Sequence, residues 1–191
     1  MKKLFAGLAL LIASAGAAYA ADSKILVAVF SRADENYSVG TITKGNTMVL
    51  AEMIAERTGG ELFEIKPAKP YPKDYKTTTE IAKREQNDNA RPALLNDKDI
   101  SGYDTIFLGY PNWWGDMPMI IYLESHDFSG KTVIPFCTHG GSGLSGTEGT
   151  LRRRLSNSRL MKGLGVNGVT AQNNRDETRK RVNEWLDGLG F

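Results

Sequence analysis

Three apolar runs constrain the fold of this chain more than any other feature of its sequence. They are 24–30 (KILVAVF), 105–110 (TIFLGY) and 131–137 (KTVIPFC), and each is rich in β-branched or aromatic residues. Continuous runs of this kind are typical of strands that are buried on both faces, as in parallel sheets covered by helices. The sequence therefore predicts a layered α/β domain.

Helical patterns alternate with these strands. The clearest begins near Asn46 or Thr47, either of which can cap it, and ends at Gly59. Two weaker strands are expected, an alternating one over 61–66 and a glycine-broken one over 160–166 that suits a sheet edge. The order is βα repeated five times, which predicts a doubly wound, five-stranded parallel sheet. Further helices are expected over 77–90 (with a capping-box pattern at Thr77 and Glu80), over 119–124 after Pro118, from Ser145, and at the C-terminus.

The first twenty residues are identified as an export signal. Lys2 and Lys3 precede an apolar stretch, and residues 18–20 (AYA) form an A-x-A cleavage pattern before Ala21. An uncleaved membrane helix would need about 20 apolar residues and no cleavage site. We therefore expect a signal peptide at 1–20 and a single domain over 21–191. The protein is expected to be exported, periplasmic or secreted, and not membrane-embedded after cleavage.

The charge and cysteine content of the mature chain limit its partners. Loss of Lys2 and Lys3 leaves 22 basic and 22 acidic side chains, from totals of 24 and 22. A neutral protein has no electrostatic reason to bind nucleic acid or anionic membrane. Cys137 is the single cysteine, so stability must come from the hydrophobic core and not from an intramolecular disulfide. No metal site is predicted.

The loop after the first strand is a candidate anion site, because ligands of doubly wound sheets bind beyond the carboxyl ends of the strands. It runs from Ser31 to the segment 43–47 (TKGNT), where hydroxyls and free amides at a helix start can surround an anion. This loop contains neither GxxxxGK[ST] nor GxGxxG, which argues against a triphosphate or dinucleotide site here. A compact monophosphate site and ordinary capping by Asn46 and Thr47 both remain open.

The loop after the second buried strand contains two adjacent tryptophans in the stretch 109–118 (GYPNWWGDMP). Consecutive side chains cannot easily both face the core, so a flat heteroaromatic ring stacked on Trp113 or Trp114 would cover the exposed indole. The alternative is that both pack under a neighbouring loop or in a subunit contact.

The loop after the third buried strand is rich in glycine, with the sequence CTHGGSGLSGTE at 137–148. Its hydroxyls and backbone amides can bind the polar edge of a ring. The G-x-S-x-G pattern of a nucleophile elbow is absent around Ser142 and Ser145, which argues against a serine hydrolase. A phosphate site, a stacking surface and ring-edge donors together suit one ligand, flavin mononucleotide (FMN).

These residues resemble the flavodoxin family, in particular its small bacterial flavodoxin-like branch. The likeness runs from ILVAVFS through TKGNT, LFEIKPAKPYP, YDTIFLGYPNWWGDMP and GKTVIPFCTHGGSG to the last helix. It implies strand order 2-1-3-4-5, with FMN at the carboxyl edge of the sheet. The cofactor-binding residues expected on these grounds are Ser31, Arg32, Asn36, Thr43, Gly45, Asn46, Thr47, Pro111, Asn112, Trp113, Trp114, Gly115, Thr138, His139, Gly140, Gly141, Ser142 and Gly143.

The chain departs from the family pattern at residues 32–42, which separate Ser31 from Thr43. This segment either folds over the cofactor, with Arg32 or Asn36 contacting phosphate or ribityl groups, or forms a surface flap.

The resemblance implies a redox protein that needs FMN and a redox partner. A neutral chain favours an oxidoreductase acting on quinones or similar small acceptors from a nicotinamide donor, because carrier flavodoxins are strongly acidic. Export counts against that donor, because nicotinamides are scarce outside the cytoplasm. A one-electron carrier and a non-redox binding module on the same fold both remain open.

Few residues are candidates for a direct part in the chemistry. His139 is the weak candidate for an acid or base, with a loop-ordering hydrogen bond as the alternative. We hypothesise that Trp113 or Trp114 lowers the reduction potential of bound FMN, because an electron-rich indole face disfavours added negative charge. Cys137 ends a buried strand and is expected to act as a small hydrophobe.

Overall fold

The computed structural model describes residues 24–115 and 120–191. The expected signal peptide and Pro118 lie outside the described residues, so both predictions stand as made. No helix in the described ranges is long and apolar enough to span a membrane.

The main sheet is parallel, and its three central strands are the apolar runs identified in the sequence. These strands are β1 (Ile25–Val29), β5 (Thr105–Pro111) and β6 (Thr132–His139), paired in that order. The alternating segment forms β4 (Glu61–Glu64), which pairs with the other side of β1. Beyond β6 the order continues to β7, so the sequence β4-β1-β5-β6-β7 confirms the predicted order 2-1-3-4-5.

The fifth strand is broken in two, as its glycine content suggested. β7 (Arg159–Leu160) and β8 (Leu164–Asn167) both pair with β6, at different positions along it. At Gly163, between them, an added Cβ would lie 2.9 Å from the carbonyl oxygen of Pro135. The backbone there approaches β6 too closely for a side chain, which interrupts regular pairing.

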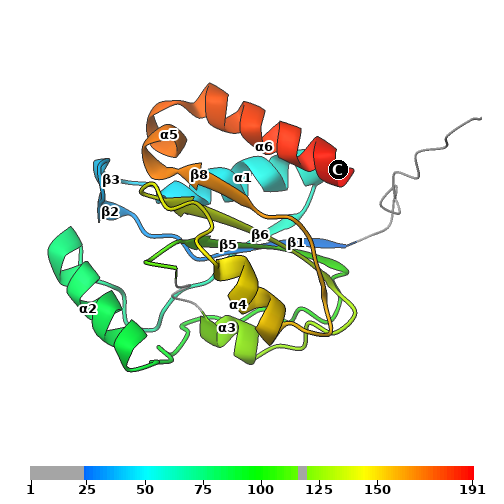
Figure 1. Cartoon of the computed structure of the whole chain (residues 1–191), viewed down its shortest axis with the longest axis horizontal. Helices are drawn as coiled ribbons and strands as arrows, with labels where there is room; N and C mark the ends of the chain where they lie inside the picture. The colour runs from blue at the N-terminus through cyan, green and yellow to red at the C-terminus, as the bar shows by residue number, and fades with distance from the viewer. Residues whose placement is uncertain (1–23, 116–119) are drawn as a thin grey trace, which may run out of the picture.

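Helices cover both faces of the sheet, as Figure 1 shows. One face carries α1 (Asn46–Thr58), α5 (Gly168–Asn173) and α6 (Arg175–Leu189), and the other carries α3 (Ile120–Glu124) and α4 (Thr147–Arg154). The helix α2 (Tyr75–Asn87) is set to the side of this layered core. The prediction of a doubly wound α/β fold is confirmed.

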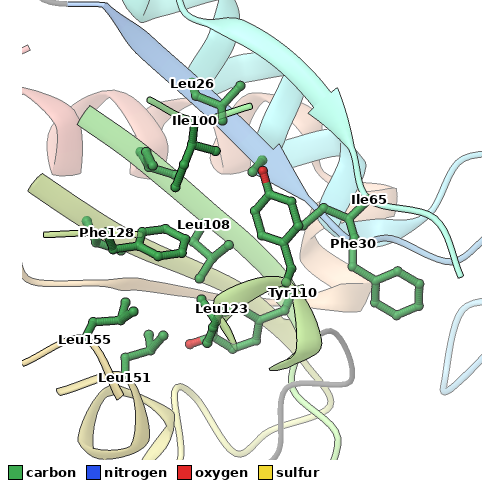
Figure 2. Packing of buried hydrophobic residues seen from close by; sticks show 14 of the residues in the cluster. Leu26, Phe30, Ile65, Ile100, Leu108, Tyr110, Leu123, Phe128, Leu151 and Leu155 are labelled. Atoms are coloured by element: carbon green, nitrogen blue, oxygen red, sulfur yellow. The ribbon is translucent and has the colours of Figure 1, made fainter. Parts of the chain in front are cut away.

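Each face of the sheet has its own hydrophobic core. Along β1, Leu26 and Ala28 belong to one buried cluster, and Val27 and Val29 to the other. Figure 2 shows the first cluster, in which Leu108 and other strand residues meet side chains from α3 and α4. This alternation explains the continuous apolar runs, because the side chains of each central strand, apart from those at its ends, are buried on one face or the other.

Three predicted helix starts differ from the structure. The capping box at Thr77 is wrong, because α2 begins at Tyr75 and the Asp74 side chain accepts from the Thr77 amide at 2.7 Å. The start at Ser145 is also wrong: α4 begins at Thr147, and Ser145 has a φ of 45°. The cap of α1 is Gly45, which makes no side-chain bond, so capping by Asn46 or Thr47 is ruled out.

Residues 32–42, where the chain departs from the family pattern, form a small hairpin that was not predicted. Its strands are β2 (Asp34–Asn36) and β3 (Gly40–Ile42), which pair antiparallel to each other and to no other strand among the described residues.

Candidate functional site

A cavity of about 580 Å³ opens beyond the carboxyl ends of β1, β5 and β6, within the range typical of small-molecule sites. All three predicted loops contribute to it. Of the predicted residues, those that line the cavity are Arg32, Asn36, Asn46, Thr47, Pro111, Asn112, Trp113, Trp114, Thr138, His139, Gly140, Gly141 and Ser142. The predicted residues outside its lining are Ser31, Thr43, Gly45, Gly115 and Gly143.

The N-terminus of α1 presents unpaired amides at the cavity. The hydroxyl of Ser31 accepts a hydrogen bond from the Met48 amide at 3.0 Å, but the amides of Asn46 and Thr47 find no acceptor in the described part of the chain. The Asn46 side-chain oxygen is buried and also lacks a partner there. An anion at this position gains from the unpaired donors and from the helix dipole.

Gly45 supports this arrangement from behind the cavity. An added Cβ would lie 2.3 Å from the Ser31 hydroxyl and 2.6 Å from the Arg32 carbonyl oxygen. Glycine is therefore required for the end of β1 to pack against the start of α1. Thr43 is exposed and takes no part in this packing.

The adjacent tryptophans have different surroundings, although both line the cavity. Trp113 packs edge-on against Phe30 and Tyr71, with ring centroids 5.9 and 5.2 Å away. Trp114 is 53% exposed and has a φ of 55°, an uncommon conformation for a bulky residue. The Lys83 ammonium lies 5.5 Å from the centroid of the Trp114 ring. The loop thus anchors one indole and leaves a large part of the other available for a ligand.

Asn112 joins the second loop to the third. Its side-chain amide donates to the carbonyl oxygen of Gly143 at 2.6 Å, and its side-chain oxygen accepts from the Gly115 amide at 2.8 Å. Its own amide donates to the Thr138 carbonyl oxygen at 2.8 Å. Gly115 and Gly143 therefore shape the site through Asn112 without lining it.

His139 is held by the backbone of its own loop. Its Nδ1 accepts from the Gly141 amide at 3.0 Å, and the ring also hydrogen-bonds the backbone of Gly165. Burial and, to a lesser degree, the nearby Arg181 lower the pKa of His139 below its usual value. Because the ring is engaged on both counts, the loop-ordering alternative is favoured over catalysis.

The hairpin is pinned to the segment before α2. The Arg32 guanidinium donates to the carbonyl oxygens of Pro72 at 2.6 Å and Lys73 at 2.8 Å. Burial lowers the pKa of Arg32, while nearby carboxylates led by Asp34 oppose that shift. The amide of Asn36 donates to backbone carbonyls of its own turn. Both side chains therefore line the cavity with most donors already in use.

The hairpin also reaches the third loop. An added Cβ on Gly140 would lie 2.8 Å from the Tyr37 ring, so this ring packs directly on the glycine. The segment 32–42 therefore covers part of the cavity, and a contact of Arg32 or Asn36 with phosphate or ribityl groups stays a prediction.

Six lining residues were missed in the sequence: Tyr37, Tyr75, Thr78, Thr79, Ala82 and Gly168. Four of them lie on α2 at positions i, i+3, i+4 and i+7, the spacing of a single helix face. That face was a readable signal, but its residues are mostly polar, so it did not stand out as one that would be covered. Tyr37 carried no comparable signal.

Cys137 faces the first core cluster and not the cavity. It is fully buried, and burial raises the pKa of its thiol to about 12. Its Sγ lies 3.5 Å from the Gly143 carbonyl oxygen. These surroundings agree with the expected role as a small hydrophobe.

A doubly wound sheet of this order, with a cavity at its carboxyl edge, defines a flavodoxin-like α/β protein. The model of the family described as flavodoxin matches residues 24–188, and the chain belongs to that family. No curated protein matches the chain significantly.

Solved structures agree with this assignment. A candidate flavoprotein from Bacteroides eggerthii DSM 20697 is 33% identical, covers 89% of this chain and 99% of its own, and has a TM-score of 0.70. One from Bacteroides uniformis ATCC 8492 is 35% identical over 86% of this chain and 98% of its own, with a TM-score of 0.68. A flavoprotein from Lactobacillus acidophilus NCFM, solved in complex with FMN, is 21% identical over 75% and 93%, with a TM-score of 0.60, and is similar in fold.

Proposed function

We propose that this protein binds FMN in the cavity and acts as an oxidoreductase on quinones or similar small acceptors. The observation that carries this proposal is the meeting of two features in one cavity. These are the unpaired amides at the start of α1 and the half-exposed indole of Trp114. The FMN complex of the Lactobacillus acidophilus flavoprotein, which is similar in fold, supports the choice of flavin.

The residues of the cavity fit the parts of FMN. In this proposal the amides of Asn46 and Thr47 hold the phosphate, with help from the dipole of α1 of about 0.3–1 kcal/mol. The indole of Trp114 stacks on the ring, and the backbone of Gly140 and Gly141 lies at the ring's polar edge. When bound, FMN supplies the electron-carrying chemistry, while the protein supplies position and electrostatics.

Two observations favour an oxidoreductase over a carrier that docks to proteins. The mature chain is neutral, so it lacks the charge that steers a carrier to its partners. The hairpin and α2 also occupy one side of the cavity, where they restrict the approach of a large partner.

A binding titration tests the cofactor. We expect the mature chain, residues 21–191, to bind FMN with quenching of flavin and tryptophan fluorescence. Riboflavin, which lacks the phosphate, should bind at least about 10-fold more weakly, because charge-assisted hydrogen bonds at α1 are lost. A Trp185→Phe variant is the matched control for the tryptophan quenching and should bind FMN as the wild type does. Trp185 Nε1 donates to the Lys162 carbonyl oxygen and its ring packs on Phe107, away from the cavity. A colourless protein that ignores added FMN would contradict the proposal.

A turnover assay tests the reaction. The FMN-loaded protein is mixed with NADH or NADPH and a quinone, and oxidation of the nicotinamide is followed. Saturable turnover supports the oxidoreductase. If the flavin accepts electrons only from chemical reductants and passes them only to redox proteins, the protein is a one-electron carrier and the proposed oxidoreductase activity is wrong.

We also propose that residues 1–20 direct export and are removed before Ala21. The basic start, apolar centre and A-x-A pattern support this proposal. The full chain is expressed in a Gram-negative host and its N-terminus is read by mass spectrometry. We expect a periplasmic product that starts at Ala21. A cytoplasmic product that retains Met1 would refute export.

A further inference from the structure

Part of the cavity wall is not among the residues proposed above to contact FMN. It consists of Tyr37 from the hairpin turn and Tyr75, Thr78, Thr79 and Ala82 from α2, and we refer to these five residues as the second wall. In Figure 1 the hairpin and α2 both lie on the same side of the layered core.

The second wall is fixed in place and is not a loose flap. The Glu35 carboxylate accepts from the Tyr75 amide at 2.7 Å, and the Glu35 amide donates to the Lys73 carbonyl oxygen at 3.1 Å. The hydroxyl of Thr78 donates to the Pro72 carbonyl oxygen at 2.8 Å. With the Arg32 contacts, these bonds join hairpin and helix into one preorganised surface.

The second wall offers aromatic surface beyond what stacking on Trp114 uses. The rings of Tyr37 and Tyr75 lie 6.0 Å apart with an interplanar angle of 39°, and Tyr37 is 58% exposed. Large aromatic side chains left exposed inside a cavity mark a surface that a ligand covers. The proposed FMN contacts use Trp114 and neither tyrosine, so we expect the tyrosines to remain for a second flat molecule.

The polar character of the cavity suits a ligand that accepts hydrogen bonds. No carboxylate lines the cavity among the described residues, whereas Arg32 lines it and Lys83 lies on the Trp114 ring. Burial and the neighbouring Tyr37 raise the pKa of the Tyr75 phenol, which therefore stays a hydrogen-bond donor at neutral pH. Carbonyl oxygens on an aromatic ring match these surroundings.

We propose that the second wall is the acceptor subsite, and that it binds a flat aromatic carbonyl compound of the naphthoquinone class. Tyr37 contacts the face of that ring, and the Tyr75 hydroxyl donates to one of its oxygens. This inference rests on the proposed FMN site, because the acceptor lies beside the cofactor in one cavity.

Calorimetric titration of the FMN-loaded protein with 1,4-naphthoquinone-2-sulfonate tests the subsite. Tyr37→Ala should raise the Kd of the quinone roughly 3- to 10-fold through lost ring contact, and Tyr75→Phe should raise it by a similar factor through the lost donor. Both variants should change the Kd of FMN by a smaller factor than the Kd of the quinone. The matched control is Tyr103→Phe, because Tyr103 belongs to a different cavity near the amino end of β1. The non-aromatic 1,4-cyclohexanedione should not bind.

The outcomes separate this proposal from the cofactor site. A protein that takes up FMN but ignores the quinone overturns the acceptor subsite alone. So does a Tyr37→Ala variant that loses FMN as strongly as the quinone, or a quinone that displaces FMN, because the tyrosines would then belong to the cofactor. Failure to bind FMN at all overturns the proposed function, and this inference with it.

Discussion

At the scale of single residues, we expect Trp113 to contribute mainly to stability and Trp114 mainly to ligand binding. Trp113→Ala removes the edge-on packing with Phe30 and Tyr71, so we expect the free energy of unfolding to fall by about 2–4 kcal/mol. Trp114→Ala should cost less than about 1 kcal/mol, because the side chain is half exposed and its backbone is strained. Urea denaturation of both variants without FMN measures the difference. Equal losses would contradict it.

The same two tryptophan substitutions test whether an indole tunes the reduction potential of bound FMN. Trp114→Ala should raise the reduction potential of bound FMN, because an electron-rich indole disfavours the added charge of the reduced flavin. Potentiometric titration with reference dyes reads this shift directly, with Trp185→Phe as the comparison. An unchanged potential in both Trp113→Ala and Trp114→Ala would discard the hypothesis.

Gly109 in β5 is a second residue whose size matters. An added Cβ would lie 2.2 Å from Cζ of Phe136 and 2.9 Å from a methyl of Val29, in the fully buried core. Gly109→Ala should therefore lower the free energy of unfolding by about 1–3 kcal/mol through overpacking. Gly102→Ala is the control, since nothing lies within 4 Å of the added methyl. An equal decrease in melting temperature for both variants would contradict this prediction, because it would show that Phe136 in β6 shifts to make room for the added methyl.

At the scale of elements, Arg32 holds the hairpin to the segment before α2. Arg32→Ala removes its bonds to the carbonyls of Pro72 and Lys73, and we expect a loss of about 1–2 kcal/mol in unfolding free energy. Hydrogen exchange of the 34–42 amides should rise, while that of the β5 amides should not. Uniformly faster exchange would mean that the hairpin is not a separate unit.

The elements also show what the sequence alone could predict. The central strands were readable because two-sided burial leaves an unbroken apolar run, as in TIFLGY of β5. The hairpin was not, because β2 reads Asp-Glu-Asn, residues depleted in strands, and Asp34 and Ser38 have φ values of 65° and 60°. Arg32 also holds the hairpin through tertiary bonds to Pro72 and Lys73, which no local pattern records.

The sequence also predicted part of the candidate site, again through the buried strands. Loops that follow buried strands are placed by the sheet, so Asn112 and Thr138 were located correctly at the cavity. Tyr37 and Tyr75 were missed because their place depends on how the hairpin and α2 dock. The start of α2 was misplaced because Asp74, and not Thr77, caps it.

At the scale of the whole molecule, the pH dependence of stability should carry a contribution from His139. Burial and Arg181 lower the pKa of its imidazole in the folded state, so the unfolded chain takes up the proton first. The full contribution is present above the unfolded pKa of about 6.5, and it is lost as the pH falls towards the folded value. Urea titrations at several pH values should show a shallower acid-side loss in His139→Gln than in the wild type. Identical slopes would contradict this assignment.

The burial of Cys137 has a consequence for handling and for experiment. Because the Cys137 thiol is fully buried and its pKa is raised to about 12, we expect it neither to cross-link folded copies nor to react with alkylating reagents. Only a molecule that has opened at the centre of the sheet exposes this sulfur. Cys137 is therefore a native probe of local unfolding. The rate at which a maleimide labels it reports how often the sheet opens around β6.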